Sequence, residues 1–428
     1  MGQLVTIKNQ IANGMMDETF ARLYGNNKDT ILYQRNRYLN ALKAFEALYP
    51  EVCEVSIFSA PGRSEICGNH TDHNNGKTLA AAVNLDIIGI AARSEKRIEV
   101  HSEGFNPNIL SADDIELCSQ QKNSAAALIK GVCKGFVNRG YSYGGFVAYT
   151  TSNVIKGSGI SSSAAFEVFI SAVLNHFYNN DEVDAVTIAQ ISQFAENEYF
   201  GKPSGLLDQT ACSVGGFITI DFKESKMPKI EKISFDFESK GYALFIVTTG
   251  GNHSDLTDEY SAIPSEMKSV AEYFGKKELR GIDRQEIIKN AAKLREKLGD
   301  RAVLRALHFV DENDRVDMAA DALKDNDFDA FLTAVKASGR SSFMYLQNIY
   351  TNQNPTEQGL SLALCICDGL LKSDGAYRVH GGGFGGTILA FVPVKKIAEF
   401  QKTMDDVFGL DACKVLGVRA EGGVVVAE

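Results

Sequence analysis

The pattern of apolar and polar positions divides the chain into a helical beginning, a strand-rich middle and a largely helical second half. Residues up to about Tyr49 are expected to be helical, with a long stretch from Thr30 to Leu48 that Pro50 closes. Strand-like runs rich in β-branched and aromatic residues follow at 52–59, 78–92, 145–154, 216–222 and 242–249. Helices are expected at 163–178 and 182–200, the second ending before Gly201 and Pro203.

Beyond residue 221 the composition changes. The charged stretch 221–240 is expected to join two domains, and helices are expected from 264 to 346, before a strand, a glycine loop and a second strand. Strands and helices are mixed without strict alternation, which favours an α+β fold over a doubly wound sheet. We therefore expect an N-terminal helical extension (1–40), an N-terminal domain (41–225) and a C-terminal domain (226–428).

Composition narrows the function classes. The chain has 428 residues and a net charge of −10, which argues against nucleic acid as a partner. No segment has the apolar length of a membrane span, and no signal peptide is recognisable at the N-terminus, so no membrane partner is expected. The eight cysteines are scattered singly apart from one C-x-C pair, which predicts reduced thiols and a cytoplasmic protein.

A glycine and serine loop runs directly into an apolar helix at residues 157–165. Its members are Gly157, Ser158, Gly159, Ile160, Ser161, Ser162 and Ser163. Small residues allow backbone N–H groups to approach an anion, and the first helical turn presents unpaired amides at the positive end of the dipole. No lysine follows the glycines, so this is not a P-loop. It predicts a phosphate cradle, although a serine-capped helix start would have the same pattern.

Three further segments carry polar residues suited to chemistry. The loop 60–76 holds Arg63, His70, Asp72 and His73, a mixture that suits a sugar; the two histidines and Asp72 could alternatively bind a metal. Glu196 and Asp208 flank a Gly/Pro turn, where Glu196 could instead be a solvated helix residue and Asp208 a helix N-cap. The third segment, 377–389, has five glycines within six residues, which predicts a close approach of the backbone to another segment or a ligand.

These segments, in this order and at this spacing, resemble the galactokinases of the GHMP sugar and metabolite kinases. Residues 63–74 are similar to the family motif G-R-x-N-L-I-G-E-H-T-D-Y-N, residues 157–165 to G-x-G-L-S-S-S-A, and residues 381–386 to G-G-G-F-G-G. Glu196 and Asp208 match A-E-x-x-x-x-G-x-P-x-G-x-x-D-Q. The resemblance extends from about Phe45 to the C-terminus and implies a two-domain kinase with its active site in the cleft between the domains.

The resemblance implies a role for each matching residue. Asp208 lies beside the anomeric hydroxyl with Arg63 as its partner, and Arg63 should keep Asp208 ionised, a weak base but a good orienter. Ser163 and Glu196 hold Mg²⁺. The loop 157–163, with Gly382 and Gly383, surrounds the triphosphate of ATP. The sugar-binding residues are Asn69, His70, Asp72, Gly205 and Tyr260.

The sequence departs from the family pattern at three positions of its first motif. Asn69 stands where the family has Glu, Glu65 where it has Asn, and His73 where it has Tyr; the paired arginines expected after Tyr260 are also missing. The family's Glu at position 69 helps to bind the C6 hydroxyl, so a neutral Asn69 keeps galacturonate open as an alternative to galactose.

The expected activity is ATP-dependent phosphorylation of the anomeric hydroxyl of galactose by a monomer. A non-catalytic sugar sensor is a further alternative, although the serine loop, Glu196 and Asp208 are all retained.

Overall fold

The computed structural model describes residues 1–117, 122–154, 159–202, 204–224, 227–250 and 256–428. Its helices are α1 Leu4–Ala12, α2 Asp17–Tyr24, α3 Lys28–Leu48, α4 Ala125–Asn138, α5 Ser162–Asn179, α6 Ala185–Phe194, α7 Leu207–Val214, α8 Thr257–Tyr273, α9 Arg284–Lys289, α10 Ala291–Leu298, α11 Asp300–Lys324, α12 Phe328–Ser341, α13 Gly359–Leu371 and α14 Ile397–Phe408. Its strands are β1 Gly2–Gln3, β2 Glu54–Cys67, β3 Lys77–Ser94, β4 Arg97–Ser102, β5 Asn108–Ser111, β6 Gly145–Ser152, β7 Phe217–Asp221, β8 Lys229–Ile233, β9 Tyr242–Thr248, β10 Ala376–His380, β11 Thr387–Pro393, β12 Cys413–Leu416 and β13 Val424–Ala427.

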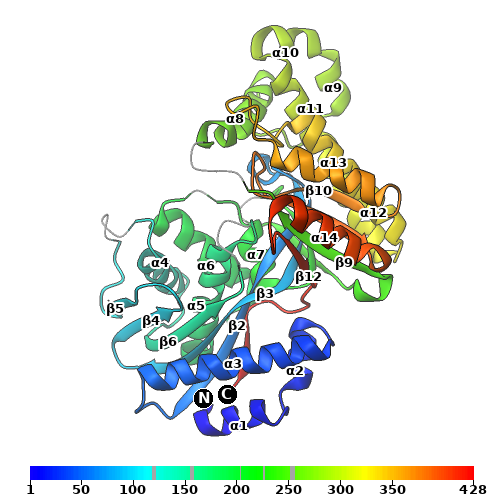
Figure 1. Ribbon diagram of the computed structural model, residues 1–428. Coiled ribbons are helices and arrows are strands. Elements are labelled where there is room, and N and C mark those ends of the chain that lie inside the picture. The colour runs from blue at the N-terminus through cyan, green and yellow to red at the C-terminus, as the bar shows by residue number, and fades with distance from the viewer. Residues whose placement is uncertain (118–121, 155–158, 203, 225–226, 251–255) are drawn as a thin grey trace.

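Two long antiparallel strands, β2 and β3, form the centre of a nine-stranded sheet among the described residues. The second half of β3 pairs with β6, and its first half pairs with β7. This branching brings the β2–β3 loop, which carries His70 and Asp72, to the end of the sheet that faces the second half of the chain (Figure 1).

Apolar side chains cover both faces of this sheet. Helices α1 to α3 lie along one face, where Leu42 and Phe45 pack with Ile57 of β2 (Figure 1). Helices α4 to α7 cover the other face, where Phe58 meets Phe169 edge to face. Since β2 and β3 are covered on both sides, their side chains are buried almost without interruption, as in the burial of β2 from Val55 to Cys67.

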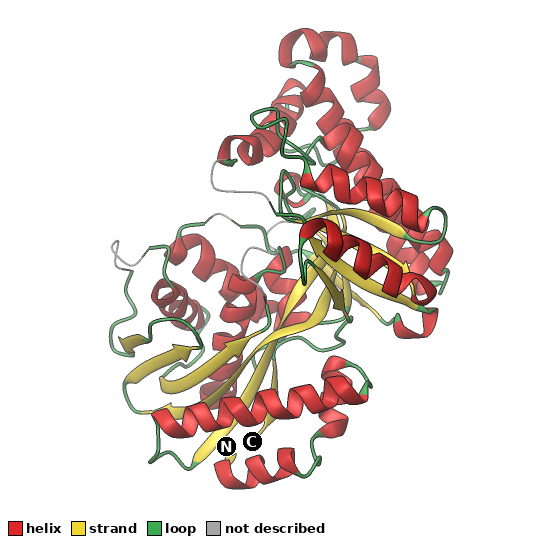
Figure 2. Cartoon of the chain, viewed as in Figure 1, coloured by secondary structure: helices red, strands yellow, loops and turns green. Residues whose placement is uncertain are grey.

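A four-stranded antiparallel sheet, in the order β10-β11-β9-β12, forms the second layer of the molecule, with α13 and α14 packed on it and α8 to α11 extending beyond it (Figure 2). The helical N-terminus and the α+β class expected from the sequence are confirmed. No helix in the described ranges is long and apolar enough to cross a bilayer.

The stretch expected only to join two domains contains a strand. Residues 229–233 form β8, which pairs antiparallel with β7 and so belongs to the first sheet. The chain also ends in the first sheet, because β13 pairs with β2. Three of the five residues in Lys229–Ile233 are charged, so the composition does not indicate this edge strand.

Candidate active site

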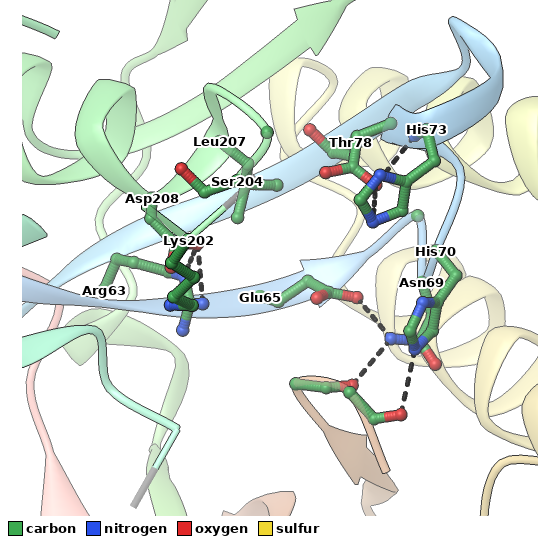
Figure 3. A pocket seen from close by; sticks show the side chains of 15 residues that line it. Arg63, Glu65, Asn69, His70, His73, Thr78, Lys202, Ser204, Leu207 and Asp208 are labelled. Atoms are coloured by element: carbon green, nitrogen blue, oxygen red, sulfur yellow. Dashed lines mark hydrogen bonds and ion pairs between the residues drawn. The ribbon is translucent and has the colours of Figure 1, made fainter. Parts of the chain in front are cut away.

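A cavity of about 270 Å³ lies between the two sheets, where the β2–β3 loop, the start of α7 and the glycine turn after β10 meet (Figure 3). The expected residues that line it are Arg63, Asn69, His70, Asp72, Gly205, Asp208 and Gly382. These come from three segments far apart in the sequence. The structure therefore brings the expected catalytic residues and, except for Tyr260, the expected sugar-binding residues to one cavity.

The carboxylate of Asp208 is held on both of its oxygens. Arg63 donates to Oδ1 from Nε at 2.7 Å and from Nη2 at 2.6 Å, and Ser161 donates to Oδ2 at 2.5 Å. Burial raises the pKa of Asp208, but the Arg63 charge and the Ser161 hydrogen bond outweigh it, so the net pKa is below the usual 3.8. Asp208 lies in the first turn of α7 without capping it, since α7 has no side-chain cap. An ionised carboxylate of fixed orientation therefore faces the cavity.

The described part of the glycine and serine loop, from residue 159 onward, packs directly on β2. The backbone N–H of Arg63 donates to the carbonyl of Ile160 at 3.1 Å, and its guanidinium donates to the carbonyl of Gly159. Any Cβ at Gly62 would lie 2.5 Å from the Ile160 side chain, so glycine permits this approach. Ile160 itself is fully buried. Gly157 and Ser158 lie outside the described residues.

Helix α5 begins immediately after Ser161, which adopts a left-handed backbone conformation and makes no side-chain cap. Ser162 and Ser163 occupy the first turn and are partly exposed. The amides of this turn therefore lack a side-chain cap from Ser161, in agreement with an anion-binding helix start.

Glu196 is buried and lies beside Ser163. The Ser163 hydroxyl donates to its Oε1 at 2.9 Å, the Lys202 ammonium lies 3.1 Å from the same oxygen, and Gln209 donates to Oε2 at 2.7 Å. Glu196 is thus not a solvated helix residue; it sits in a π-helical turn, Ala195–Phe200, that continues α6. One hydroxyl and one carboxylate oxygen are the sparse donor set that Mg²⁺ takes when phosphates supply other ligands. In this structure the cation that contacts Glu196 is the Lys202 ammonium.

His70 and Asp72 approach the cavity from the β2–β3 loop. Burial lowers the pKa of His70 to about 4, so the ring is neutral at pH 7. Its Nε2–H donates to the carbonyl of Gly382 at 2.9 Å, which leaves Nδ1 as an acceptor. Asp72 lies against Gly205, where a Cβ would collide with its carboxylate. No set of three or more metal-binding side chains converges in the described ranges.

Tyr260 is not among the residues that line the cavity, but it packs on the glycine turn that borders it. The Tyr260 hydroxyl donates to the carbonyl of Gly383 at 2.7 Å, and a Cβ at Gly382 would lie 2.5 Å from the Tyr260 ring. Gly383 has a φ of +86° and lies tightly against Asn348. Glycine is therefore required at both positions, and Gly382 borders the cavity on the side of His70.

Glu65 and Lys202 are charged cavity residues that were not among the expected site residues. Glu65 lies two positions after Arg63 on β2, so strand alternation places both side chains on one face, a signal present in the sequence. Lys202 had no such signal, because it reaches Glu196 only through the turn that ends the π-helical segment.

Comparison with known proteins gives consistent matches. Residues 43–93 match the model "Galactokinase galactose-binding signature", and residues 127–216 match "GHMP kinases N terminal domain". The chain is 30% identical over 380 residues to a galactokinase of Streptomyces coelicolor, covering 87% of this chain and 94% of that protein. A galactokinase of Lactobacillus helveticus is 28% identical over 376 residues, covering 86% and 93%.

Solved structures share the fold. A Lactococcus lactis galactokinase complexed with galactose superposes with a TM-score of 0.73 at 22% identity, covering 96% of this chain and 99% of that one. A Methanococcus jannaschii mevalonate kinase superposes with a TM-score of 0.61 at 16% identity, covering 85% and 98%. At these identities the likeness establishes the architecture of a GHMP-type kinase.

Proposed function

This chain belongs to the galactokinase family, and from that premise we propose that it transfers the γ-phosphoryl group of ATP to the anomeric hydroxyl of galactose. The observation that carries the proposal is the carboxylate of Asp208, fixed by Arg63 and Ser161 at the edge of the polar cavity. Ser161 also belongs to the serine loop, so one side chain links the sugar cavity to the phosphate-binding segment.

Asp208 accepts a hydrogen bond from the anomeric hydroxyl. This hydrogen bond orients the oxygen of the hydroxyl toward the γ-phosphorus. As the new O–P bond forms and the bond to ADP breaks, the hydroxyl loses its proton, and Asp208 is the carboxylate positioned to take it. Phosphoryl transfer depends mainly on positioning and charge stabilisation, so an ionised carboxylate of low basicity suffices. Arg63 keeps Asp208 in place and adds positive charge beside the transferred group.

The residues of the serine loop and the first turn of α5 are proposed to hold the triphosphate, with Gly382 and Gly383 closing the site. Ser163 and Glu196 are proposed to hold Mg²⁺, which when bound neutralises charge on the β- and γ-phosphates. The support is the contact between Ser163 and Glu196, together with the Lys202 ammonium that lies beside Glu196. Lys202 must release Oε1 for the metal to bind there, and its ammonium is then free to face the phosphates.

His70, Asp72, Gly205 and Tyr260 are proposed to form the sugar-binding side. The neutral His70 and the Asp72 carboxylate supply acceptors for sugar hydroxyls, Gly205 makes room for Asp72, and Tyr260 supports the glycine turn.

The domain division 1–40, 41–225 and 226–428 and a monomeric state remain predictions, and α3, which runs to Leu48, crosses the first boundary. A cytoplasmic location is likewise proposed, supported by the need for ATP and by seven free thiols in the described ranges.

The test is ADP release by the purified protein with ATP and a panel of hexoses, with the product identified by phosphorus NMR. Galactose is expected to be the fastest substrate and galactose 1-phosphate the product. Absence of phosphorylation of every hexose, with galactose still bound, would favour the sensor alternative. A product phosphorylated at another carbon would contradict the placement of the anomeric hydroxyl at Asp208.

A further inference from the structure

The side chain of Asn69 has no hydrogen-bonding capacity left for a ligand. Its Nδ2 donates to Glu65 Oε1 at 2.9 Å and to the carbonyl of Gly381 at 2.8 Å. Its Oδ1 accepts from Asn348 at 2.8 Å and from Ser342 at 3.3 Å. A carboxamide offers two donors and two acceptor positions, and all four are used. Asn69 is also only 1% exposed, so it fastens the β2–β3 loop to the glycine turn.

Glu65 differs from Asn69 in having an acceptor to spare. Its Oε1 receives the Asn69 amide and lies 3.4 Å from Nη2 of Arg378, while no donor in the described ranges bonds to Oε2. The residue lines the cavity, and its side chain is 11% exposed. Oε2 is therefore open to the cavity, and a hydroxyl of a bound ligand can donate to it in place of water.

The placement of Glu65 relative to the reacting group suits a sugar ring. Arg63 and Glu65 pair with Ala82 and Ala80 in uninterrupted register, so they lie on one face of β2, about 6.6 Å apart along the strand. Arg63 holds Asp208, where the anomeric hydroxyl is proposed to bind. Figure 3 shows Glu65 between the Arg63–Asp208 pair and the His70 side of the cavity. A group at this distance meets a hydroxyl on the part of the ring remote from the anomeric carbon.

We propose that Glu65, and not Asn69, is the residue that selects the sugar: its Oε2 accepts a hydrogen bond from a hydroxyl remote from the anomeric carbon and repels a carboxylate at that position. The proposal rests on the function proposed above. On this proposal neutral hexoses are the substrate class and hexuronates are poor substrates. Asn69 is neutral, so the charge that repels a hexuronate comes from Glu65.

The sequence motif agrees with this assignment. The galactokinase pattern has Asn at the position of Glu65 and Glu at the position of Asn69, so this chain has exchanged the two residues. Because the two side chains are hydrogen-bonded to each other, the exchange keeps one carboxylate and one carboxamide in the pair. Relative to the family pattern, the negative charge has moved from position 69 in the β2–β3 loop to position 65 in strand β2.

Arg378 holds the Glu65 carboxylate through Oε1 and leaves Oε2 free. This arginine is fully buried and donates from Nη1 to the carbonyl of Ile66 at 2.9 Å and to Ser338 at 3.0 Å. Burial raises the pKa of Glu65 above its usual value, and the charges of Arg378 and Arg63 limit that rise. If Glu65 served only as a counter-ion for these arginines, its replacement would change stability but not substrate specificity. The experiment therefore measures specificity as well as stability.

The test is to compare galactose and galacturonate as substrates of the wild type and of Glu65→Gln. The variant keeps an acceptor for Asn69 and removes the charge. We expect its KM for galactose to rise at least tenfold with kcat within about threefold of wild type, and the ratio of kcat/KM for galactose over galacturonate to fall at least tenfold. An unchanged ratio would overturn the proposal.

Ser342→Ala is the matched control, because it removes a donor to Asn69 without touching Glu65. Its galactose to galacturonate ratio should equal that of the wild type; a fall as large as that of Glu65→Gln would show that any disturbance of the network changes specificity, and would refute a selective role for Glu65.

The wild type supplies a measurement that needs no variant. Galacturonate should be phosphorylated with a kcat/KM at least a hundredfold below that of galactose, and equal use of both sugars would refute the proposal even if Glu65→Gln does not fold. Failure of the wild type to phosphorylate galactose would instead refute the function proposed above, so the two failures are distinguishable.

Discussion

Replacing Asp208 by Asn is expected to lower turnover at least a hundredfold without disturbing the fold. Arg63 can keep its contacts to the remaining oxygen, and the new amide can donate to Ser161, whose hydroxyl then accepts. The variant therefore retains the shape and the hydrogen bonds of the site and loses the negative charge.

Two effects set the size of the loss. A hydrogen bond to a charged group contributes about 1.5–3 kcal/mol, which at about 1.4 kcal/mol per factor of ten corresponds to roughly a ten- to hundredfold change in rate. Acceptance of the proton by a positioned group contributes roughly a further hundredfold or more. Because the pKa of Asp208 is below 3.8, the wild type should show no decline in kcat from this group above about pH 5.

The assay is ADP release at saturating ATP and galactose, with circular dichroism to confirm folding. Asp221→Asn is the matched control: Asp221 pairs with Arg280 at 2.8 Å, and its side chain is 27% exposed, against 28% for Asp208. It should keep turnover within about twofold, since it lies outside the cavity. A folded Asp208→Asn enzyme within about threefold of wild type would refute the assignment of Asp208 to the reacting group.

Three other changes test separate parts of the structure. Glu196→Ala should raise the Mg²⁺ concentration needed for half-maximal rate at least tenfold while galactose binding without nucleotide stays the same; an unchanged Mg²⁺ titration would remove it from the metal site. Gly205→Ala should raise the KM for galactose about tenfold, because its Cβ displaces Asp72. The control Gly369→Ala, in an open position of α13, should leave the kinetics unchanged and stabilise the fold by about 0.5–1 kcal/mol. Equal kinetic effects of the two variants would contradict the expected collision with Asp72. Asp86 is buried and forms ion pairs with the buried Arg37 and Arg419. Asp86→Ala should therefore lower the free energy of unfolding in urea by about 3–5 kcal/mol, because both arginines lose their carboxylate partner; a loss below about 1 kcal/mol would show that these ion pairs are not stabilising.

Local patterns in the sequence were sufficient for much of the fold. The uninterrupted stretch that became α3, the apolar runs of β2 and β3 and the serine loop before α5 all follow from periodicity and from Gly and Pro positions. Motif order and spacing also indicated the kinase family. The strand β8 escaped detection because, in a five-residue edge strand, two lysines and a glutamate outnumber two isoleucines.

The pairing of side chains was decided by the tertiary structure alone. Arg63 and Asp208 are 145 residues apart, and only the packing of α7 beside β2 brings them within 2.7 Å. The same holds for the role of Asn69: its sequence position indicates a sugar contact, but Ser342 and Asn348, contributed from more than 270 positions away, complete its hydrogen bonds.

The sequence by itself determined which residue types are available at each turn and strand, because backbone preferences and apolar periodicity act over a few neighbours. Which polar atoms remain free for a ligand depended on the tertiary structure, because hydrogen-bonding capacity is used up by whatever partners the fold brings close. Asn69 and Glu65 show the difference: four positions apart in one motif, they exchange roles once Asn348 and Arg378 are in place.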